Sequence, residues 1–248
     1  MGVAWSIASN TGVRAPIIPI LALFAALGLG CQESGFDEAK ETARPLKVQH
    51  ILGESKVPGQ AEAPAPMSVE ALDDTLALKV EPVAASVPGG KVPSYLRGRA
   101  RGVPLLAPGA LPPADADVII ASAPQTKSEF MQLTAVAPTV VIDAGGPQWK
   151  LNLRLVGEAL GRTNDAEALL SAYDEQLASV RESLPADAKV AGAYPNDSFA
   201  AAVLADAGVE LVARGQAANQ LKSSAWSGPG GALAAQAALG ELQQTLGR

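Results

Sequence analysis

The sequence predicts an α/β fold with short parallel sheets, divided into two parts by a long helical stretch. Three runs of apolar, largely β-branched residues lie at 80–86, 116–122 and 138–146. Such runs are typical of strands that are buried on both faces of a parallel sheet. A helical pattern at 126–137 separates the second run from the third, as a parallel crossover requires. Residues 149–184 are helical almost throughout and divide the chain into its two parts.

The composition excludes several classes of protein. The chain has 248 residues, a formal net charge of −6, 48% hydrophobic residues, one Cys and one His. This apolar content is too high for a disordered chain. A single Cys excludes an internal disulfide, and a single His excludes a metal centre with several histidines. The acidic balance argues against nucleic acid as a partner, because phosphates require a basic surface.

The N-terminal residues predict an export signal followed by a lipid anchor. Residues 1–30 contain one charged residue, Arg14, and end in an apolar stretch that stops directly before Cys31. A single cation followed by a short apolar run is typical of a signal peptide. The position of Cys31, the only cysteine, resembles a bacterial lipobox, in which cleavage exposes the Cys for lipidation. The alternative is an uncleaved anchor helix with an incidental Cys. The polar residues 31–46 are interpreted as a linker.

The first part of the folded chain begins with a short strand pattern at 48–53. The Pro/Ala-rich residues 59–66 cannot form a central strand, because proline donates no hydrogen bond to a neighbouring strand. Ser68 is the expected N-cap of a helix that runs to about Lys79, with Glu70 in its first turn.

The second part begins with helices predicted at 149–162 and from Asn164 or Asp165 to 184, before Pro185. A strand is predicted at 188–194. A helix should then begin at Asp197 or Ser198, and a terminal helix should cover 230–248.

Six segments together carry a resemblance to a known family: 48–58, 67–86, 92–96, 136–162, 165–184 and 197–210. They resemble the iron–siderophore substrate-binding lipoproteins of ABC importers, a family also used for haem and cobalamin. The resemblance implies two small Rossmann-like lobes with parallel sheets, joined by one long α-helix. The implied N-terminal lobe is 47–162, the joining helix 163–184 and the C-terminal lobe 185–248.

The chain also departs from the family pattern in ways that imply internal deletions. Residues 59–66 stand where the family has a β-strand, and the helix before 116–122 is missing. The C-terminal lobe is shortened between 210 and the terminal helix. The missing helices normally carry glutamates that dock onto the permease, and no matching glutamate is found. Ligand binding and delivery to a permease are therefore separate predictions.

The resemblance implies a monomeric, lipid-anchored binding protein at the cell surface or in the periplasm, which captures a ferric siderophore for an ABC permease. Iron enters inside its chelator, so the protein needs neither a cofactor nor a metal ligand of its own. One alternative is an orphan surface module that binds a siderophore, haem or cobalamin without a permease. A more remote alternative is an exported hydrolase, but no nucleophile–base set is recognised, so we expect no enzyme.

The candidate ligand-binding residues lie in loops that follow predicted strands, where parallel sheets place ligands. Tyr95, Arg97 and Arg99 lie in a basic loop at 91–101, and guanidinium groups pair well with the oxyanions of an anionic chelate. The alternative is a solvated basic loop. Trp149 is either a stacking surface for the chelate or an anchor at a helix start. Tyr194, in a turn of the second lobe, is expected to face the ligand from the opposite side.

Overall fold

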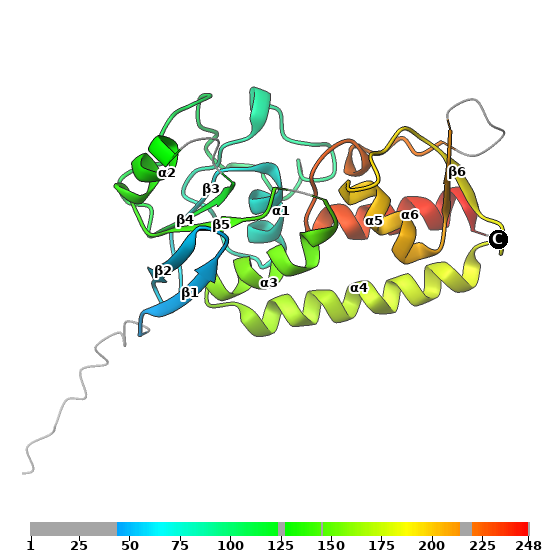
Figure 1. Cartoon of the computed structure of the whole chain (residues 1–248), viewed down its shortest axis with the longest axis horizontal. Helices are drawn as coiled ribbons and strands as arrows, with labels where there is room; N and C mark the ends of the chain where they lie inside the picture. Colours follow the sequence, from blue (N-terminus) through cyan, green and yellow to red (C-terminus); the bar gives the residue numbers. More distant parts are fainter. Residues whose placement is uncertain (1–43, 124–126, 145, 214–219, 248) are drawn as a thin grey trace, which may run out of the picture. The chain divides into compact units, whose positions relative to one another are not determined.

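The computed structural model describes residues 44–123, 127–144, 146–213 and 220–247 (Figure 1). All of them belong to one compact unit formed by Lys40–Arg248. The predicted signal and Cys31 lie outside the described residues. No helix within the described ranges is both long enough and apolar enough to cross a membrane.

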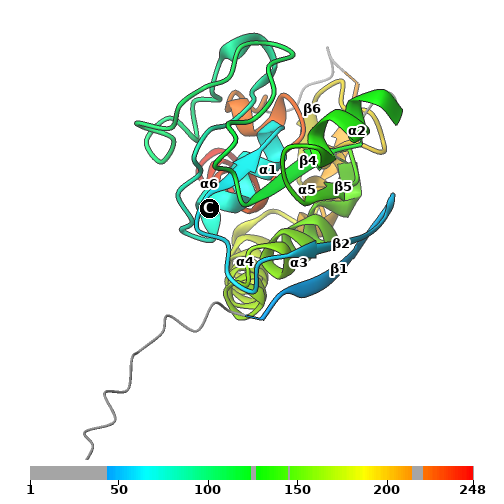
Figure 2. The same cartoon turned by 90° about the vertical axis from the view of Figure 1, so that its left-hand side faces the viewer.

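The described chain begins with an antiparallel hairpin formed by β1 (Leu46–His50) and β2 (Gly53–Val57). The hairpin lies beside α3 (Trp149–Ala159), as Figure 2 shows. The Ser55 hydroxyl donates to the carbonyl oxygen of Thr139 at 2.7 Å and thereby ties the hairpin to the main sheet.

The main sheet has three parallel strands in the order β3 (Pro64–Pro66), β4 (Val118–Ser122) and β5 (Thr139–Ile142). The strands predicted within 116–122 and 138–146 are therefore confirmed. All four residues of β5 and four of the five residues of β4 are buried, as expected for a sheet covered on both faces.

The strand predicted at 80–86 is wrong, and β3 takes its place in the sheet. The Val83 and Ser86 N–H groups donate to the carbonyl oxygens of Pro64 and Pro66 at 3.0 and 2.9 Å. Residues 80–86 thus lie along the free edge of β3. Pro64 and Pro66 have no N–H group, so they cannot donate hydrogen bonds to this segment. Residues 59–66 therefore contribute an edge strand, which is a position that tolerates proline.

Helices cover the sheet and join the two parts of the chain. Helix α1 (Val69–Ala77) begins at the predicted cap, because the Ser68 hydroxyl accepts from the Ala71 N–H at 3.2 Å. Helix α2 (Lys127–Thr134) joins β4 to β5, and α3 follows β5. Helix α4 (Thr163–Ser183) runs from its contact with α3 to its contact with α6 (Ala232–Leu246) (Figure 1).

The C-terminal part contains a parallel pair, β6 (Lys189–Ala191) and β7 (Glu210–Val212), with α5 (Phe199–Ala207) between them. Ser198 is the N-cap of α5 and accepts from Ala201 at 3.1 Å, which decides between the two predicted caps. Strand β7 was not predicted. A 3₁₀ helix, η3 (Ser224–Trp226), precedes α6.

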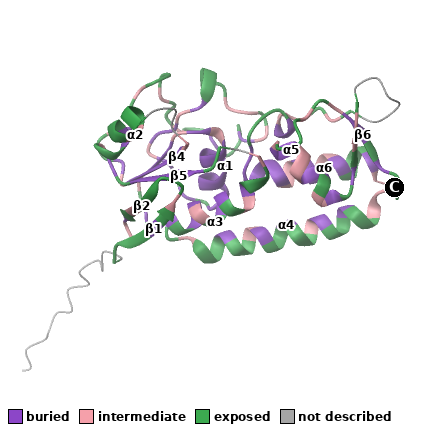
Figure 3. Cartoon of the chain, viewed as in Figure 1, coloured by how far each residue is buried: buried purple, intermediate pink, exposed green. Residues whose placement is uncertain are grey.

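One large hydrophobic core extends through both parts of the described chain. Leu72 of α1, Leu153 of α3, Tyr173 of α4 and Leu239 of α6 all belong to it. Figure 3 shows α1 and α6 largely buried, while the outer face of α4 is exposed. Because this core is continuous, the lobe boundaries at 162 and 184 stay predictions.

Candidate ligand-binding site

A cavity of about 740 Å³ lies where α1 approaches the C-terminal part of the chain. Its volume is within the usual range for small-molecule sites. Its wall is built from the start of α1, the loop after β5, the turn before α5 and the segment before α6. The lining residues are Glu70, Ala144, Gly146, Ala193, Tyr194, Pro195, Asp197, Ser198, Phe199, Ala200, Leu221, Lys222, Ser223, Trp226, Ser227, Gly228 and Pro229.

The carboxyl ends of the central strands position one side of this cavity. Glu70, in the first turn of α1, accepts a hydrogen bond from the hydroxyl of Ser122, the last residue of β4. Ala144 and Gly146 follow β5. The cavity therefore lies where parallel α/β sheets place their ligands. Glu70 is only 4% exposed, so its carboxyl group is held in the wall.

Two aromatic residues, Tyr194 and Trp226, also line the cavity. The rings of Tyr194 and Trp226 lie with their centroids 6.3 Å apart at a tilt of 40°. Trp226 is 3% exposed, whereas Tyr194 is half-buried and offers more of its ring to the cavity. A side chain at Gly192 would collide with the Tyr194 ring, so this glycine permits the ring's position.

Glu241 of α6 holds the segment 221–229 in place. Its carboxylate accepts from the backbone N–H of Lys222 at 2.6 Å and of Ser223 at 3.0 Å, and from the indole N–H of Trp226 at 2.8 Å. Hydrogen bonds to a charged acceptor are stronger than neutral ones. One carboxylate thus fixes three donors of the cavity wall.

The end of the same wall is attached to α1 by two buried aspartates. Asp73 accepts from the N–H groups of Leu233 at 2.7 Å, Ala234 at 3.0 Å and Gly231 at 3.2 Å, at the start of α6. Asp74 accepts from Ala232 at 2.9 Å. A carboxylate at a helix N-terminus satisfies N–H groups that lack partners within the helix.

Burial dominates the electrostatics of these two aspartates. It raises the pKa of Asp73 to about 6, although the three backbone hydrogen bonds act in the opposite direction. It also raises the pKa of Asp74 well above its ordinary value, and the neighbouring charge of Asp73 adds to that shift. Protonation is favoured because a buried charge loses its hydration.

A second pocket of about 340 Å³ adjoins the cavity and shares Ser227, Gly228 and Pro229 with it. The basic loop reaches this pocket, and Ser94 joins it to the segment before α6. The Ser94 N–H donates to Ser224 Oγ at 3.0 Å, and the two hydroxyls lie 2.7 Å apart. The pocket's lining from the basic loop is Lys91, Val92, Pro93, Ser94, Tyr95 and Arg97.

The structure separates the three candidates of the basic loop. Arg97 and Tyr95 line the adjoining pocket. Burial raises the pKa of Tyr95, and the charge of nearby Asp73 contributes. Arg99 lies instead on another pocket, beside Lys79 and Glu81. Arg97 and Arg99 therefore line different pockets, and the ligand-binding roles of the three residues stay predictions.

Tyr194 lines the cavity as expected, but Trp149 does not. The Trp149 side chain is 1% exposed, and its ring makes edge contacts with Tyr173 and Phe199 at centroid distances of 4.8 and 6.1 Å. Of the two interpretations of Trp149, its burial supports the anchor at a helix start. A ligand could stack on this ring only after the core had opened.

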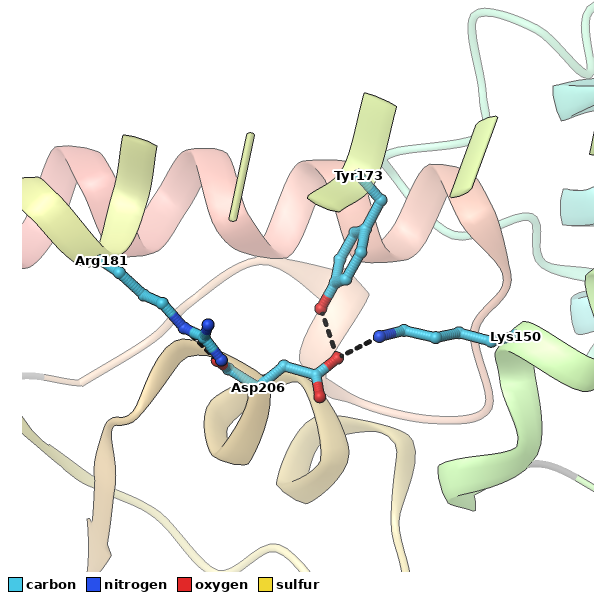
Figure 4. Close-up of polar contacts among 4 residues, drawn as sticks. All are labelled: Lys150, Tyr173, Arg181 and Asp206. Atoms are coloured by element: carbon cyan, nitrogen blue, oxygen red, sulfur yellow. Dashed lines mark hydrogen bonds and ion pairs between the residues drawn. The ribbon is translucent and has the colours of Figure 1, made fainter. Parts of the chain in front are cut away.

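A polar cluster fastens α5 to α3 and α4 (Figure 4). Asp206 Oδ2 accepts from the Tyr173 hydroxyl at 2.9 Å and lies 2.8 Å from Lys150 Nζ. Arg181 donates to the Asp206 carbonyl oxygen, with Nε at 2.7 Å. The four residues of this cluster contact one another, and none of them lines the cavity.

Sequence reasoning missed Glu70 and Trp226 as lining residues. Glu70 was interpreted only as an acidic residue favourable at a helix start, which is a common local pattern. Trp226 lies in a segment where the resemblance to the family fails. Within the described ranges, no group of three or more His, Cys, Asp or Glu side chains is arranged to hold a metal ion.

No protein-family model matches the chain. A curated relative, the probable siderophore-binding lipoprotein YfiY of Bacillus subtilis, is 24% identical over 174 residues. The match covers 66% of this chain and 54% of the relative, so the chain spans about half the length of that protein.

Solved structures show the same fold. The catecholate-siderophore binding protein VctP from Vibrio cholerae is 18% identical with a TM-score of 0.57, and the match covers 81% of this chain and 99% of that one. FeuA from Bacillus subtilis, complexed with ferri-bacillibactin, is 19% identical with a TM-score of 0.55 and coverages of 72% and 71%. The iron uptake substrate-binding protein PiaA from Streptococcus pneumoniae is 17% identical with a TM-score of 0.55 and coverages of 67% and 68%.

These comparisons confirm the predicted fold class and the resemblance stated from the sequence. The chain has the α/β fold of substrate-binding proteins from iron–siderophore uptake systems. The proteins named above are binding proteins, in agreement with the prediction that the chain is not an enzyme.

Proposed function

We propose that this chain is an extracytoplasmic solute-binding protein that captures a ferric siderophore in the 740 Å³ cavity. The observation that carries the proposal is the position of this cavity, at the carboxyl ends of β4 and β5 and against the segment before α6. The curated relative is named as a siderophore-binding lipoprotein, which supports the same class of ligand.

The wall offers contacts that suit a bulky chelate. Tyr194 presents a ring face and a phenol group, and Ser198, Ser223 and Ser227 add hydroxyl groups. Iron would arrive already coordinated by the siderophore, so the protein has only to recognise the outside of the chelate. Arg97, in the adjoining pocket, is placed to reach a peripheral oxyanion.

Membrane attachment and a transporter complete the proposed role. Lipidation at Cys31 would anchor the protein outside the membrane, as the name of the curated relative suggests. An ABC permease is the proposed partner. The second candidate is an orphan binding module for a siderophore, haem or cobalamin. It is favoured by the lack, in this sequence, of segments that match the permease-docking helices of the family.

Tryptophan fluorescence tests the proposal, because Trp226 lies in the cavity wall. Titration with ferric siderophores, haem and cobalamin should give saturable quenching by a ferric siderophore. Trp226→Phe should reduce the signal while equilibrium dialysis still detects binding. No binding to any ferric siderophore would contradict the proposal, and tighter binding of haem or cobalamin would favour the second candidate. Reconstitution with a permease separates delivery from binding.

A further inference from the structure

The charges in the wall of the cavity are not balanced. Among the described residues, the charged side chains that line it are Glu70, Asp197 and Lys222. Asp197 and Lys222 are both exposed, so water screens their charges. Glu70 is 4% exposed, and no cationic side chain of the described lining is buried beside it.

More acidic groups lie behind Glu70. Asp73 and Asp74 follow it on α1, and both are fully buried. Both side chains accept hydrogen bonds from backbone N–H groups at the start of α6. Among the described lining residues, Glu70 is therefore the buried carboxyl group of the wall, and it has no buried cationic side chain beside it. Charges interact more strongly in such a setting than in bulk water.

We propose that this cavity selects a ferric chelate with little or no net charge, such as a ferric trihydroxamate, and discriminates against a trianionic ferric tris-catecholate. This inference rests on the proposed function. Three hydroxamates balance the charge of Fe³⁺, whereas three doubly ionised catecholates leave a charge of −3 on the complex. A trianion would have to lose hydration while it approached the Glu70 carboxyl group.

The basic groups nearby do not remove this repulsion. Lys91 and Arg97 line the adjoining pocket, and both are exposed. Exposed cations contribute little, because solvent screens their attraction. They can accommodate one peripheral anionic substituent that extends past Ser227 and Gly228, the residues shared by the two pockets. In the proposed complex, the iron centre lies in the cavity that Glu70 lines.

Two chelates of the same metal test the proposal in the unmodified protein. Dissociation constants for a neutral ferric trihydroxamate and a trianionic ferric tris-catecholate should be measured by tryptophan fluorescence at one ionic strength. We expect the neutral chelate to bind at least tenfold more tightly. Equal or tighter binding of the tris-catecholate would overturn the charge preference and leave the proposed function standing. Failure of both chelates to bind would instead contradict the proposed function.

A single substitution tests whether Glu70 causes the discrimination between the two chelates. Glu70→Gln keeps the size of the side chain and removes its charge. It should strengthen binding of the tris-catecholate by about tenfold and thereby reduce the ratio of the two dissociation constants. The control is Glu182→Gln, on the exposed face of α4, which should change neither affinity. If Glu70→Gln folds and the tris-catecholate affinity stays at the wild-type value, the proposal fails. If it does not fold, the wild-type comparison still decides.

Discussion

Asp73 should make the folded protein less stable as the pH rises from about 4 to about 7. Burial raises the pKa of Asp73 from 3.8 to about 6 in the folded state. Between these values the folded protein binds more protons than the unfolded chain, so its stability falls with increasing pH. The favourable contribution is complete below pH 3.8 and is lost as the pH rises through about 6.

The size of the effect follows from the shift. One pKa unit corresponds to about 1.4 kcal/mol, so a shift of roughly two units corresponds to about 3 kcal/mol of unfolding free energy. Asp74 acts in the same direction, because its pKa is also raised. The full pH dependence of the wild type therefore includes more than Asp73, and a variant is needed to isolate it.

Urea denaturation of wild type and Asp73→Asn at several pH values between 4 and 7.5 provides the measurement. Asn cannot ionise, and its side-chain oxygen can still accept one of the three backbone N–H groups. The difference in unfolding free energy between the two proteins should shift by about 3 kcal/mol over this range, in favour of Asp73→Asn at high pH. Asp115→Asn, at an exposed position, is the matched control. A difference that stays constant with pH would refute the argument.

Changes at three further positions should have separable effects. Trp149→Ala should lower the unfolding free energy by about 3–5 kcal/mol in urea denaturation, because it empties a buried site. Trp149→Phe should fold and bind the ligand as the wild type does. If this variant folds but does not bind, Trp149 is part of the binding site. Glu241→Gln should weaken siderophore binding by about tenfold and change the emission of Trp226, because the side chain loses one acceptor oxygen. Unchanged affinity would show that the cavity wall does not depend on this carboxylate. Cys31→Ser should move the protein to the soluble fraction after cell fractionation, whereas retention in the membrane would indicate an uncleaved anchor.

The elements that depend on local patterns were predictable from the sequence. Ser68 and Ser198 cap their helices because a hydroxyl that precedes a helix can reach an N–H three residues later. The apolar runs that became β4 and β5 are short and β-branched, and they identified the buried part of the sheet. Tyr194 was expected in the site because its turn follows a predicted strand, and it lines the cavity.

Only the tertiary structure decided the features that depend on distant partners. The edge position of Pro64 and Pro66 could not be recognised locally, because the residues beside them are far away in the chain. Arg97 and Arg99 are two positions apart, yet the fold directs them to different pockets. Asp73 appears in the sequence as an ordinary helix residue, and its acceptor role depends on N–H groups about 160 residues away. A local pattern determines which conformation a segment prefers, whereas burial and partner choice are set by the whole chain packing around one core.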